Sequence, residues 1–257
     1  MHPNNQHIVI TGAAHGIGQG LSRRFAAEGA KKIALIDLDE AAVQAVASDI
    51  GARAYAVDVA DADAFAHTLR TIESDLGHID LFCSNAGVGY ADGEHVAAAS
   101  DALWEKTWRI NVHAHVVAAR ELLPAMLKRQ QGHFLITASA AGLLSQIGSA
   151  SYSTSKHAAV GFAESLAIMH GDQGIGVSLL CPQGVDTRMM AAVAGGGPQG
   201  ADGIMPIETL CDAVMQGLDA ETFLILPHPQ VGDYMQFKVA NYDKWLGGMR
   251  KLRDQFA

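Results

Sequence analysis

Seven short apolar runs alternate with six longer stretches of helical periodicity along the 257 residues, and this alternation constrains the fold more than any other feature. The short runs are apolar on both faces, as central strands of a parallel sheet are; they span 7–11, 32–37, 54–58, 79–84, 132–139, 177–181 and 223–226. The stretches between them predict helices over 17–28, 40–50, 61–76, 104–129, 150–170 and 206–217. Strict alternation predicts one α/β domain, a doubly wound and mostly parallel seven-stranded sheet with helices on both faces.

The charge balance argues against two classes of partner. With 18 basic and 27 acidic residues the net charge is −9, so no basic face is expected for phosphate backbones or anionic lipid. The first residues lack a leader pattern, and no run approaches the roughly 18 apolar residues of a membrane span. We therefore expect a cytoplasmic protein that binds neither nucleic acid nor a membrane.

Cysteine and histidine spacing predicts no metal site. Cys83, Cys181 and Cys211 have neither metal-type spacing nor a paired framework, so we expect buried, reduced thiols. His113 and His115 are two residues apart and would diverge on a helix.

Residues 11–18 carry Gly12, Gly16 and Gly18 between the first predicted strand and the first predicted helix. Glycines there let the backbone turn tightly and approach a pyrophosphate, which rests on the helix N-terminus. Asp37 ends the second strand nineteen residues after Gly18, where a carboxylate can bind both hydroxyls of an adenosine ribose and repel a 2′-phosphate.

The cofactor prediction is therefore NAD rather than NADP. His15 in the glycine turn is a weak, pH-dependent counterweight to that preference. The alternative is that Asp37 caps the following helix, for which Asp39 is the better candidate.

Tyr152 and Lys156 lie four residues apart, so on a helix both face one site, with Ser139 thirteen residues upstream of Tyr152. A phenol has a pKa near 10, and lowering it to about 7 requires roughly 4 kcal/mol of phenolate stabilisation. One cation at 4–5 Å contributes about 3–4 kcal/mol at an effective dielectric of ~20, before desolvation. The pair is thus a candidate acid/base that needs one further cation.

Together these motifs resemble the short-chain dehydrogenase/reductase family in its compact form, over about residues 6–227. The resemblance rests on the glycine turn, on Asp58-Val59, on Asn85-Ala86-Gly87, and on four residues in the order of the family's catalytic tetrad, Asn111, Ser139, Tyr152 and Lys156. It implies a Rossmann-type fold and a set of cofactor contacts: Gly12, His15, Gly16, Ile17, Gly18, Asp37, Leu38, Asp58, Val59, Asn85, Ala86, Gly87, Tyr152, Lys156, Val185 and Thr187.

The resemblance also implies catalytic roles. Tyr152 would exchange a proton with the substrate oxygen, and Ser139 would hydrogen-bond that oxygen. Lys156 would bind the nicotinamide ribose and lower the tyrosine pKa, while Asn111 would position a relay water. The oxidised nicotinamide would be the second cation, and the hydride chemistry belongs to the cofactor.

Two features depart from the family pattern. Gln183 stands where the family usually has a glycine after the sixth strand, so a polar side chain is expected near the pocket. Residues 229–257 form an extra tail whose apolar residues suggest one helical stripe, which could cover a neighbouring subunit's pocket; they are Tyr234, Phe237, Trp245, Met249, Leu252 and Phe256.

Our leading hypothesis is an NAD-dependent oxidoreductase that interconverts a secondary alcohol and a ketone. Apolar residues near the predicted pocket favour a hydrophobic cyclic or aromatic substrate; they are Leu143, Leu144, Met189 and Met190. The loops 88–100 and 188–205 are the expected ligand loops, the latter contacting substrate. The alternatives are a 3-oxoacyl thioester reductase, against which Asp37 argues, and a non-catalytic NAD-binding regulator.

Two predicted helical segments are apolar around most of their circumference, 111–127 and 151–169. Because one sheet face cannot cover that much apolar surface, they predict a homo-oligomer, a tetramer or a dimer.

Overall fold

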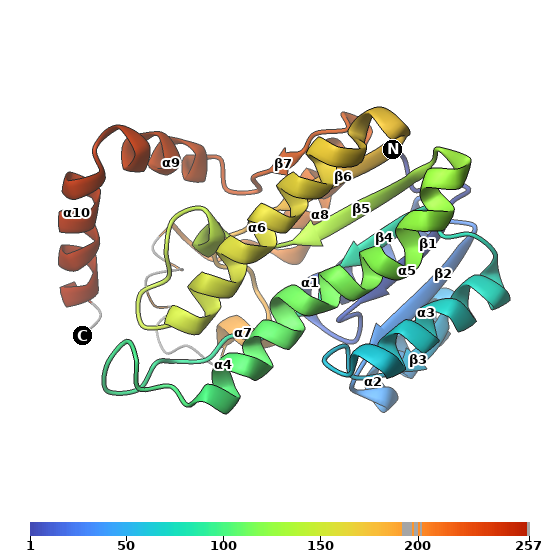
Figure 1. Cartoon of the computed structure of the whole chain (residues 1–257), viewed down its shortest axis with the longest axis horizontal. Helices are drawn as coiled ribbons and strands as arrows, with labels where there is room; N and C mark the ends of the chain where they lie inside the picture. Colours follow the sequence, from blue (N-terminus) through green and yellow to red (C-terminus); the bar gives the residue numbers. More distant parts are fainter. Residues whose placement is uncertain (192–196, 198–199, 201, 256–257) are drawn as a thin grey trace.

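A computed structural model describes residues 1–191, 197, 200 and 202–255 and contains one seven-stranded parallel sheet (Figure 1). Its strand order is β3-β2-β1-β4-β5-β6-β7, and every neighbouring pair is parallel. The strands are β1 (His7–Thr11), β2 (Lys32–Asp37), β3 (Arg53–Ala56), β4 (Leu81–Ser84), β5 (Gly132–Thr137), β6 (Ile175–Leu180) and β7 (Leu224–Ile225). The predicted single Rossmann-type α/β domain is confirmed.

Helices cover both faces of the sheet. The longer ones are α1 (Gly16–Ala27), α2 (Glu40–Ile50), α3 (Ala62–Leu76), α4 (Asp101–Trp108), α5 (Ala114–Arg129), α6 (Ala150–His170) and α8 (Ile207–Asp219). One apolar core lies between the sheet and α3, α5 and α6, which are in front of the sheet in Figure 1. The other core lies between the sheet and α1, α2 and α8. All five residues of β1 are buried, as expected for a central strand with apolar side chains on both faces.

The position of the functional site follows from the strand order. The chain moves outward from β1 to β2 and β3, then returns to β4 on the other side of β1. Crossovers therefore leave β1 and β4 in opposite directions, which opens a crevice beyond their carboxyl ends. At this edge the Asn85 backbone nitrogen donates to Thr11 Oγ1 (2.9 Å) and Asn85 Nδ2 donates to the Thr11 carbonyl (3.1 Å).

The predicted helix 104–129 differs from the observed segment in two ways. It starts earlier, at Asp101, because the Ser100 hydroxyl accepts a hydrogen bond from the Leu103 backbone nitrogen and caps α4. It is also interrupted between α4 and α5 by a π-helical turn, η1 (Arg109–His113), which contains Asn111. Most of the other predicted elements have bounds within about two residues of the observed ones.

The tail folds into two helices, α9 (Gln230–Ala240) and α10 (Tyr242–Gln255), rather than the single stripe expected from the spacing. The break is at Asn241, whose backbone leaves the helical region at φ −142°. α10 turns sharply away from α9 and stands at the edge of the molecule (Figure 1). Phe256 lies outside the described residues.

The predicted substrate loop 188–205 lies partly outside the described residues. Its start forms a short helix, α7 (Arg188–Ala191). Its end lies beside the segment before α7, where the Met205 backbone nitrogen donates to the Gly184 carbonyl (2.9 Å). The three cysteines are buried and free, which confirms the prediction made for them. Within the described residues, no helix combines the length and apolarity needed to traverse a bilayer. The expected absence of a metal remains a prediction.

Candidate active site

The turn between β1 and α1 depends on its glycines. Gly12 and Gly16 have positive φ angles of 65° and 54°, which side chains disfavour. A Cβ at Gly12 would lie 2.9 Å from Ala86 Cα, and one at Gly18 would lie 2.1 Å from the Gly12 carbonyl oxygen. The backbone therefore packs directly against the segment after β4, and the amides that begin α1 stay open to an anion.

Asp37 and Asp39 have separate tasks at the end of β2. Asp39 accepts a hydrogen bond from the Ala42 backbone nitrogen (3.1 Å) and is the N-cap of α2, so Asp37 is not the cap. Asp37 instead accepts from the Ala14 backbone nitrogen (2.9 Å) and from that of Asp39 (3.1 Å). Its carboxylate is thus fixed beside the glycine turn, where it lines the cavity.

The π turn places Asn111 behind the site. Its Oδ1 accepts from the Val88 backbone nitrogen (2.9 Å), and its Nδ2 donates to the Val88 carbonyl (2.8 Å) and to Ser155 Oγ (3.0 Å). The side chain is completely buried. Asn111 therefore ties η1, the segment after β4 and α6 together. A Cβ added to Gly87 would lie 3.4 Å from both Asn111 Oδ1 and Lys156 Nζ, so the three residues are close neighbours.

Tyr152 and Lys156 share the first turns of α6, and the Lys156 nitrogen lies 5.6 Å from the centre of the Tyr152 ring. Lys156 is 3% exposed and donates to the Thr137 carbonyl at the end of β5 (2.9 Å). Ser139 lies two residues after Thr137, and its hydroxyl accepts from the Ala141 backbone nitrogen (3.1 Å) and donates to the Pro182 carbonyl (3.4 Å). The structure thus brings together all three side chains predicted to face the substrate and cofactor.

Burial dominates the electrostatics of this pair. It raises the pKa of Tyr152 above 10, and the opposing effect of the Ser139 hydroxyl offsets only part of that rise. Burial also lowers the pKa of Lys156 to about 8. The predicted lowering of the tyrosine pKa requires Lys156 together with an oxidised nicotinamide and stays a prediction; desolvation of the buried phenol is the effect that these two cations would have to overcome.

A cavity of about 1030 Å³ joins the glycine turn to this group. Twelve of the residues predicted to contact cofactor line it: Gly12, His15, Gly16, Ile17, Asp37, Asn85, Ala86, Gly87, Tyr152, Lys156, Val185 and Thr187. Open amides at the start of a helix, a carboxylate at the ribose position and a lysine beside the acid/base candidate fit a nicotinamide dinucleotide.

Four predicted cofactor residues are not among those that line the cavity. Gly18 packs inside the turn, and Leu38 is 70% exposed. Asp58 is exposed and accepts from the Ala60 backbone nitrogen (2.9 Å), while Val59 is buried in the core.

Gln183 lines the cavity, as its place in the sequence suggested. Its Oε1 is buried and has no hydrogen-bond partner within the part of the chain that the structure describes. An unpaired buried oxygen favours a ligand that donates a hydrogen bond to it.

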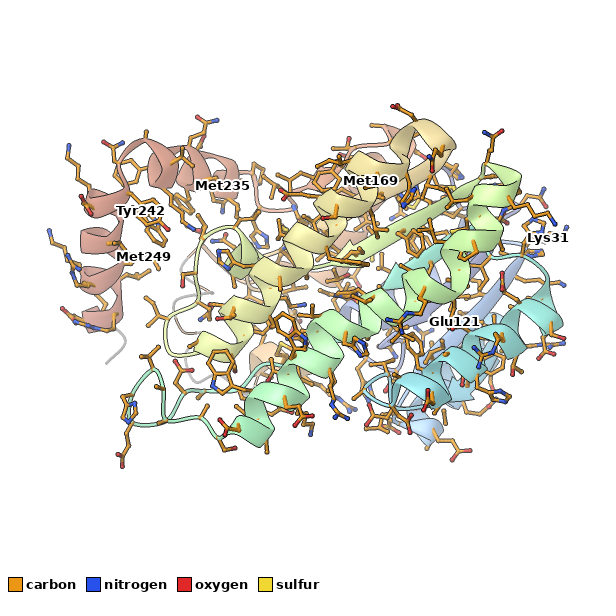
Figure 2. The ribbon with its side chains drawn as sticks, viewed as in Figure 1. Lys31, Glu121, Met169, Met235, Tyr242 and Met249 are labelled. Atoms are coloured by element: carbon orange, nitrogen blue, oxygen red, sulfur yellow. The ribbon has the colours of Figure 1, made fainter. Side chains whose placement is uncertain are left out.

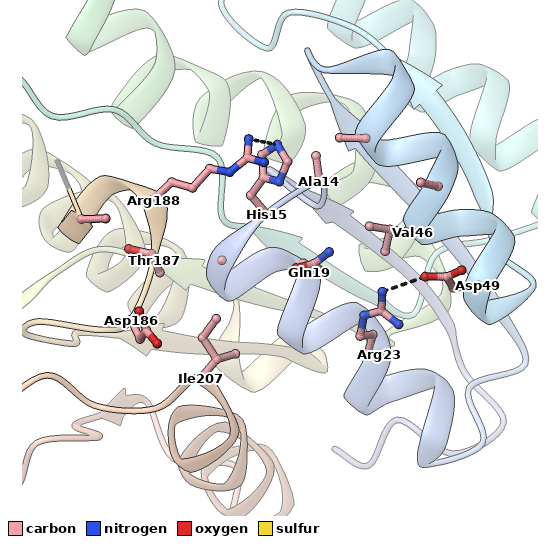
Figure 3. A pocket seen from close by; sticks show the side chains of 14 residues that line it. Ala14, His15, Gln19, Arg23, Val46, Asp49, Asp186, Thr187, Arg188 and Ile207 are labelled. Carbon is pink, nitrogen blue, oxygen red and sulfur yellow. Dashed lines mark hydrogen bonds and ion pairs between the residues drawn. The ribbon is translucent and has the colours of Figure 1, made fainter.

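Arg188 is a residue that the sequence analysis missed. Its guanidinium reaches the glycine turn, with Nη1 2.7 Å from His15 Nε2, and that histidine nitrogen is 3.3 Å from Asp39 Oδ2. Arg188 and His15 line both the main cavity and a second one of about 560 Å³ between α1, α2 and α7 (Figure 3). Its position next to Thr187 was the only available signal.

The tail also contributes residues to the site. Side chains of α9 and α10 line the cavity of their own chain, and the hypothesis that the tail covers a neighbouring subunit's pocket stays a prediction. They belong to Tyr234, Phe237, Trp245, Met249 and Leu252.

Known proteins resemble this chain over most of its length. A family model described as short chain dehydrogenase matches residues 6–195. A 1-deoxy-11-beta-hydroxypentalenate dehydrogenase from Streptomyces exfoliatus is 33% identical over 238 residues, 88% of this chain and 84% of that protein. A meso-2,3-butanediol dehydrogenase from Serratia marcescens is 34% identical over 192 residues, 74% of this chain and 75% of that protein. A solved short chain dehydrogenase/reductase from Burkholderia phymatum, in complex with NAD, superposes on this chain with a TM-score of 0.84 at 25% identity. The superposition covers 95% of this chain and 96% of that one.

Proposed function

Since the chain belongs to the short-chain dehydrogenase/reductase family of oxidoreductases, we propose that it is an NAD-dependent alcohol dehydrogenase that interconverts a hydrophobic secondary alcohol and its ketone. One observation carries the proposal: Ser139, Tyr152 and Lys156 line the same cavity as the glycine turn and Asp37. An acid/base group and a dinucleotide cradle in one cavity are what hydride exchange with an alcohol requires.

Proton transfer is assigned to Tyr152. In the oxidative direction its ionised form, the phenolate oxygen, accepts the proton of the substrate hydroxyl, and in the reductive direction the phenol hydroxyl returns that proton to the carbonyl oxygen. The Ser139 hydroxyl hydrogen-bonds the same substrate oxygen and stabilises the charge that develops on it. When bound, NAD supplies the hydride acceptor and a positive charge beside the phenol.

Lys156 and Asn111 are assigned supporting roles in that proton transfer. Lys156 would hold the nicotinamide ribose through its ammonium group, which burial makes easy to deprotonate because its pKa is lowered to about 8. Asn111 would hold a water through which the lysine exchanges protons with solvent. Its rigid hydrogen bonds to Val88 and Ser155 suit that positioning role.

The preference for NAD is assigned to Asp37. Its carboxylate is fixed by the Ala14 and Asp39 backbone nitrogens, so it cannot move away from a 2′-phosphate without losing both bonds. The solved relative from Burkholderia phymatum is in complex with NAD, which supports the same choice. His15 and Arg188 lie near enough to weaken the preference.

The substrate class is inferred from the lining of the cavity beyond Ser139. Apolar side chains dominate there and come from the loop before α6 and from α7, including Leu144, Ile147, Met189 and Met190. A hydrophobic cyclic or aromatic alcohol would bury its ring against them. The names of both relatives, a hydroxypentalenate and a butanediol dehydrogenase, support an alcohol substrate.

The proposal is tested by steady-state assays that follow reduced cofactor with a panel of secondary alcohols, in which NAD and NADP are compared at equal concentration. Cyclic and aromatic alcohols should be oxidised with NAD, and matched primary alcohols serve as controls. Turnover of no secondary alcohol, or a higher kcat/KM with NADP, would contradict the proposal.

We also propose that the chain assembles as a homo-oligomer, a tetramer or a dimer. Apolar side chains stay exposed near the end of α6, where Ile168 is 80% and Met169 is 65% exposed. Such exposure favours a partner surface. Light scattering that reports only a monomer at assay concentrations would contradict it.

A further inference from the structure

The tail lies beyond the segment that matches the family model, and yet it forms one wall of the substrate side of the cavity. α10 packs against α9, and its Trp245 is only 8% exposed. Met249 extends from α10 on the side facing the rest of the chain (Figure 2). Phe237 is 48% exposed although it lines the cavity, so its ring is free to contact a ligand.

Lys238 connects this wall to the segment that follows Ser139. Its ammonium donates to the carbonyl oxygens of Leu143 and Leu144, each at 2.9 Å. These two residues follow the short helical turn η2 (Ala140–Gly142), which Ser139 caps. One lysine of α9 therefore reaches the segment that carries the serine of the proposed reaction.

The same ammonium also holds α10. It lies 4.8 Å from the centre of the Trp245 ring and 5.7 Å from that of Tyr242, and the two rings meet edge to face with centroids 5.7 Å apart. These distances are those of cation–π contacts. Within the described ranges no carboxylate pairs with Lys238, so its charge is met by two carbonyls and two aromatic rings.

We propose that Lys238 is a positioning residue that fixes the α9–α10 wall over the cavity, and that this wall selects bulky apolar secondary alcohols over small ones. The inference rests on the proposed alcohol dehydrogenase function. A small alcohol fills only the space beside Ser139 and Tyr152, whereas the rings of a larger one extend to Phe237 and Trp245. Lost contacts of one or two apolar groups change specificity about tenfold or more.

Three variants separate this role from a general effect on folding. Lys238→Met keeps most of the length of the side chain and removes the charge, and Lys238→Arg keeps the charge. Lys244→Met removes an exposed lysine from α10 and is the matched control. Each is assayed with 2-butanol and with a bicyclic secondary alcohol of the size of borneol.

For Lys238→Met we expect KM for the bicyclic alcohol to rise about tenfold or more, with kinetics on 2-butanol and NADH affinity within about twofold of the wild type. Lys238→Arg should restore much of the difference, and Lys244→Met should behave like the wild type. Hydrogen exchange of residues 242–255 should also be faster in Lys238→Met, because α10 loses its anchor.

Two results would overturn the inference. One is an unchanged ratio of kcat/KM for the two alcohols in Lys238→Met, and the other is unchanged hydrogen exchange of α10. If the wild type oxidises no secondary alcohol, the proposed function fails. The exchange measurement, together with calorimetry of bicyclic ketone binding to the enzyme with NADH, then still decides the role of Lys238.

Discussion

Replacing Lys156 by methionine should remove the proposed activity and, at the same time, the pH dependence that this one lysine gives to the stability of the fold. The lysine is 3% exposed, and burial lowers its pKa from 10.5 to about 8. At about 1.36 kcal/mol per pKa unit, keeping this group charged at neutral pH destabilises the folded protein by roughly 3 kcal/mol. The hydrogen bond from Lys156 to the Thr137 carbonyl is lost in the variant at every pH, and the part of that bond that depends on the charge of the lysine is already contained in the pKa.

The sign of the pH dependence follows from proton binding. Between about pH 8 and 10.5 the unfolded chain keeps the Lys156 proton that the folded chain has lost, so the contribution of Lys156 to wild-type stability rises across this window. Lys156→Met lacks that rise. The unfolding free energy of the variant minus that of the wild type should therefore be greatest below pH 8 and should fall by about 3 kcal/mol by pH 10.5.

Urea titrations of the cofactor-free proteins at several pH values between 7 and 10.5 measure this difference. Lys128→Met, at an exposed lysine, controls for the loss of one surface charge. If the plots of unfolding free energy against pH run parallel for the wild type and Lys156→Met between about pH 8 and 10.5, the reasoning is refuted, because the burial of Lys156 would then carry no electrostatic cost.

Three further substitutions test the cofactor and substrate sides of the cavity. Gly16→Ala forces a side chain onto φ 54° with its Cβ 2.9 Å from Thr187 Cγ2, so NADH affinity by fluorescence titration should fall about tenfold; unchanged affinity would contradict the tight turn. Asp37→Ser should lower the ratio of kcat/KM for NAD over NADP about tenfold or more, and a constant ratio would remove Asp37 as the determinant. Gln183→Leu should lower kcat/KM about tenfold for diols but not for simple alcohols, because the buried Oε1 has no partner among the described residues, and equal effects on both would reject that contact.

Much of the fold could be predicted because the strands are apolar on both faces and glycine or polar residues mark their ends. β1 and β2 have the predicted bounds, and so do α2 and α6. The π turn at Asn111 could not be predicted, because it depends on hydrogen bonds to Val88 and Ser155, which are distant in the sequence. The local spacing of apolar residues does not indicate hydrogen bonds between distant segments.

The positions of the candidate site residues could be predicted where a motif lies within a single turn or helix, as at residues 11–18 and at Tyr152 and Lys156. They could not be predicted where distant segments meet. Lys238 reads as an ordinary helix-surface lysine, and only the folded chain brings it to Leu143 and Trp245. The spacing of Tyr152 and Lys156 also indicates a nearby cation but does not measure the desolvation of the buried phenol, which raises its pKa.

The most direct test of the central claim is the kcat/KM of Tyr152→Phe for a secondary alcohol oxidised by the wild type, measured alongside NADH affinity. The variant removes one hydroxyl from the cavity and leaves the ring. The account predicts a fall of about a thousandfold in kcat/KM with NADH affinity unchanged, since the loss is of a proton acceptor and not of the cofactor site. Turnover within about tenfold of the wild type would contradict the assignment of Tyr152 as the acid/base.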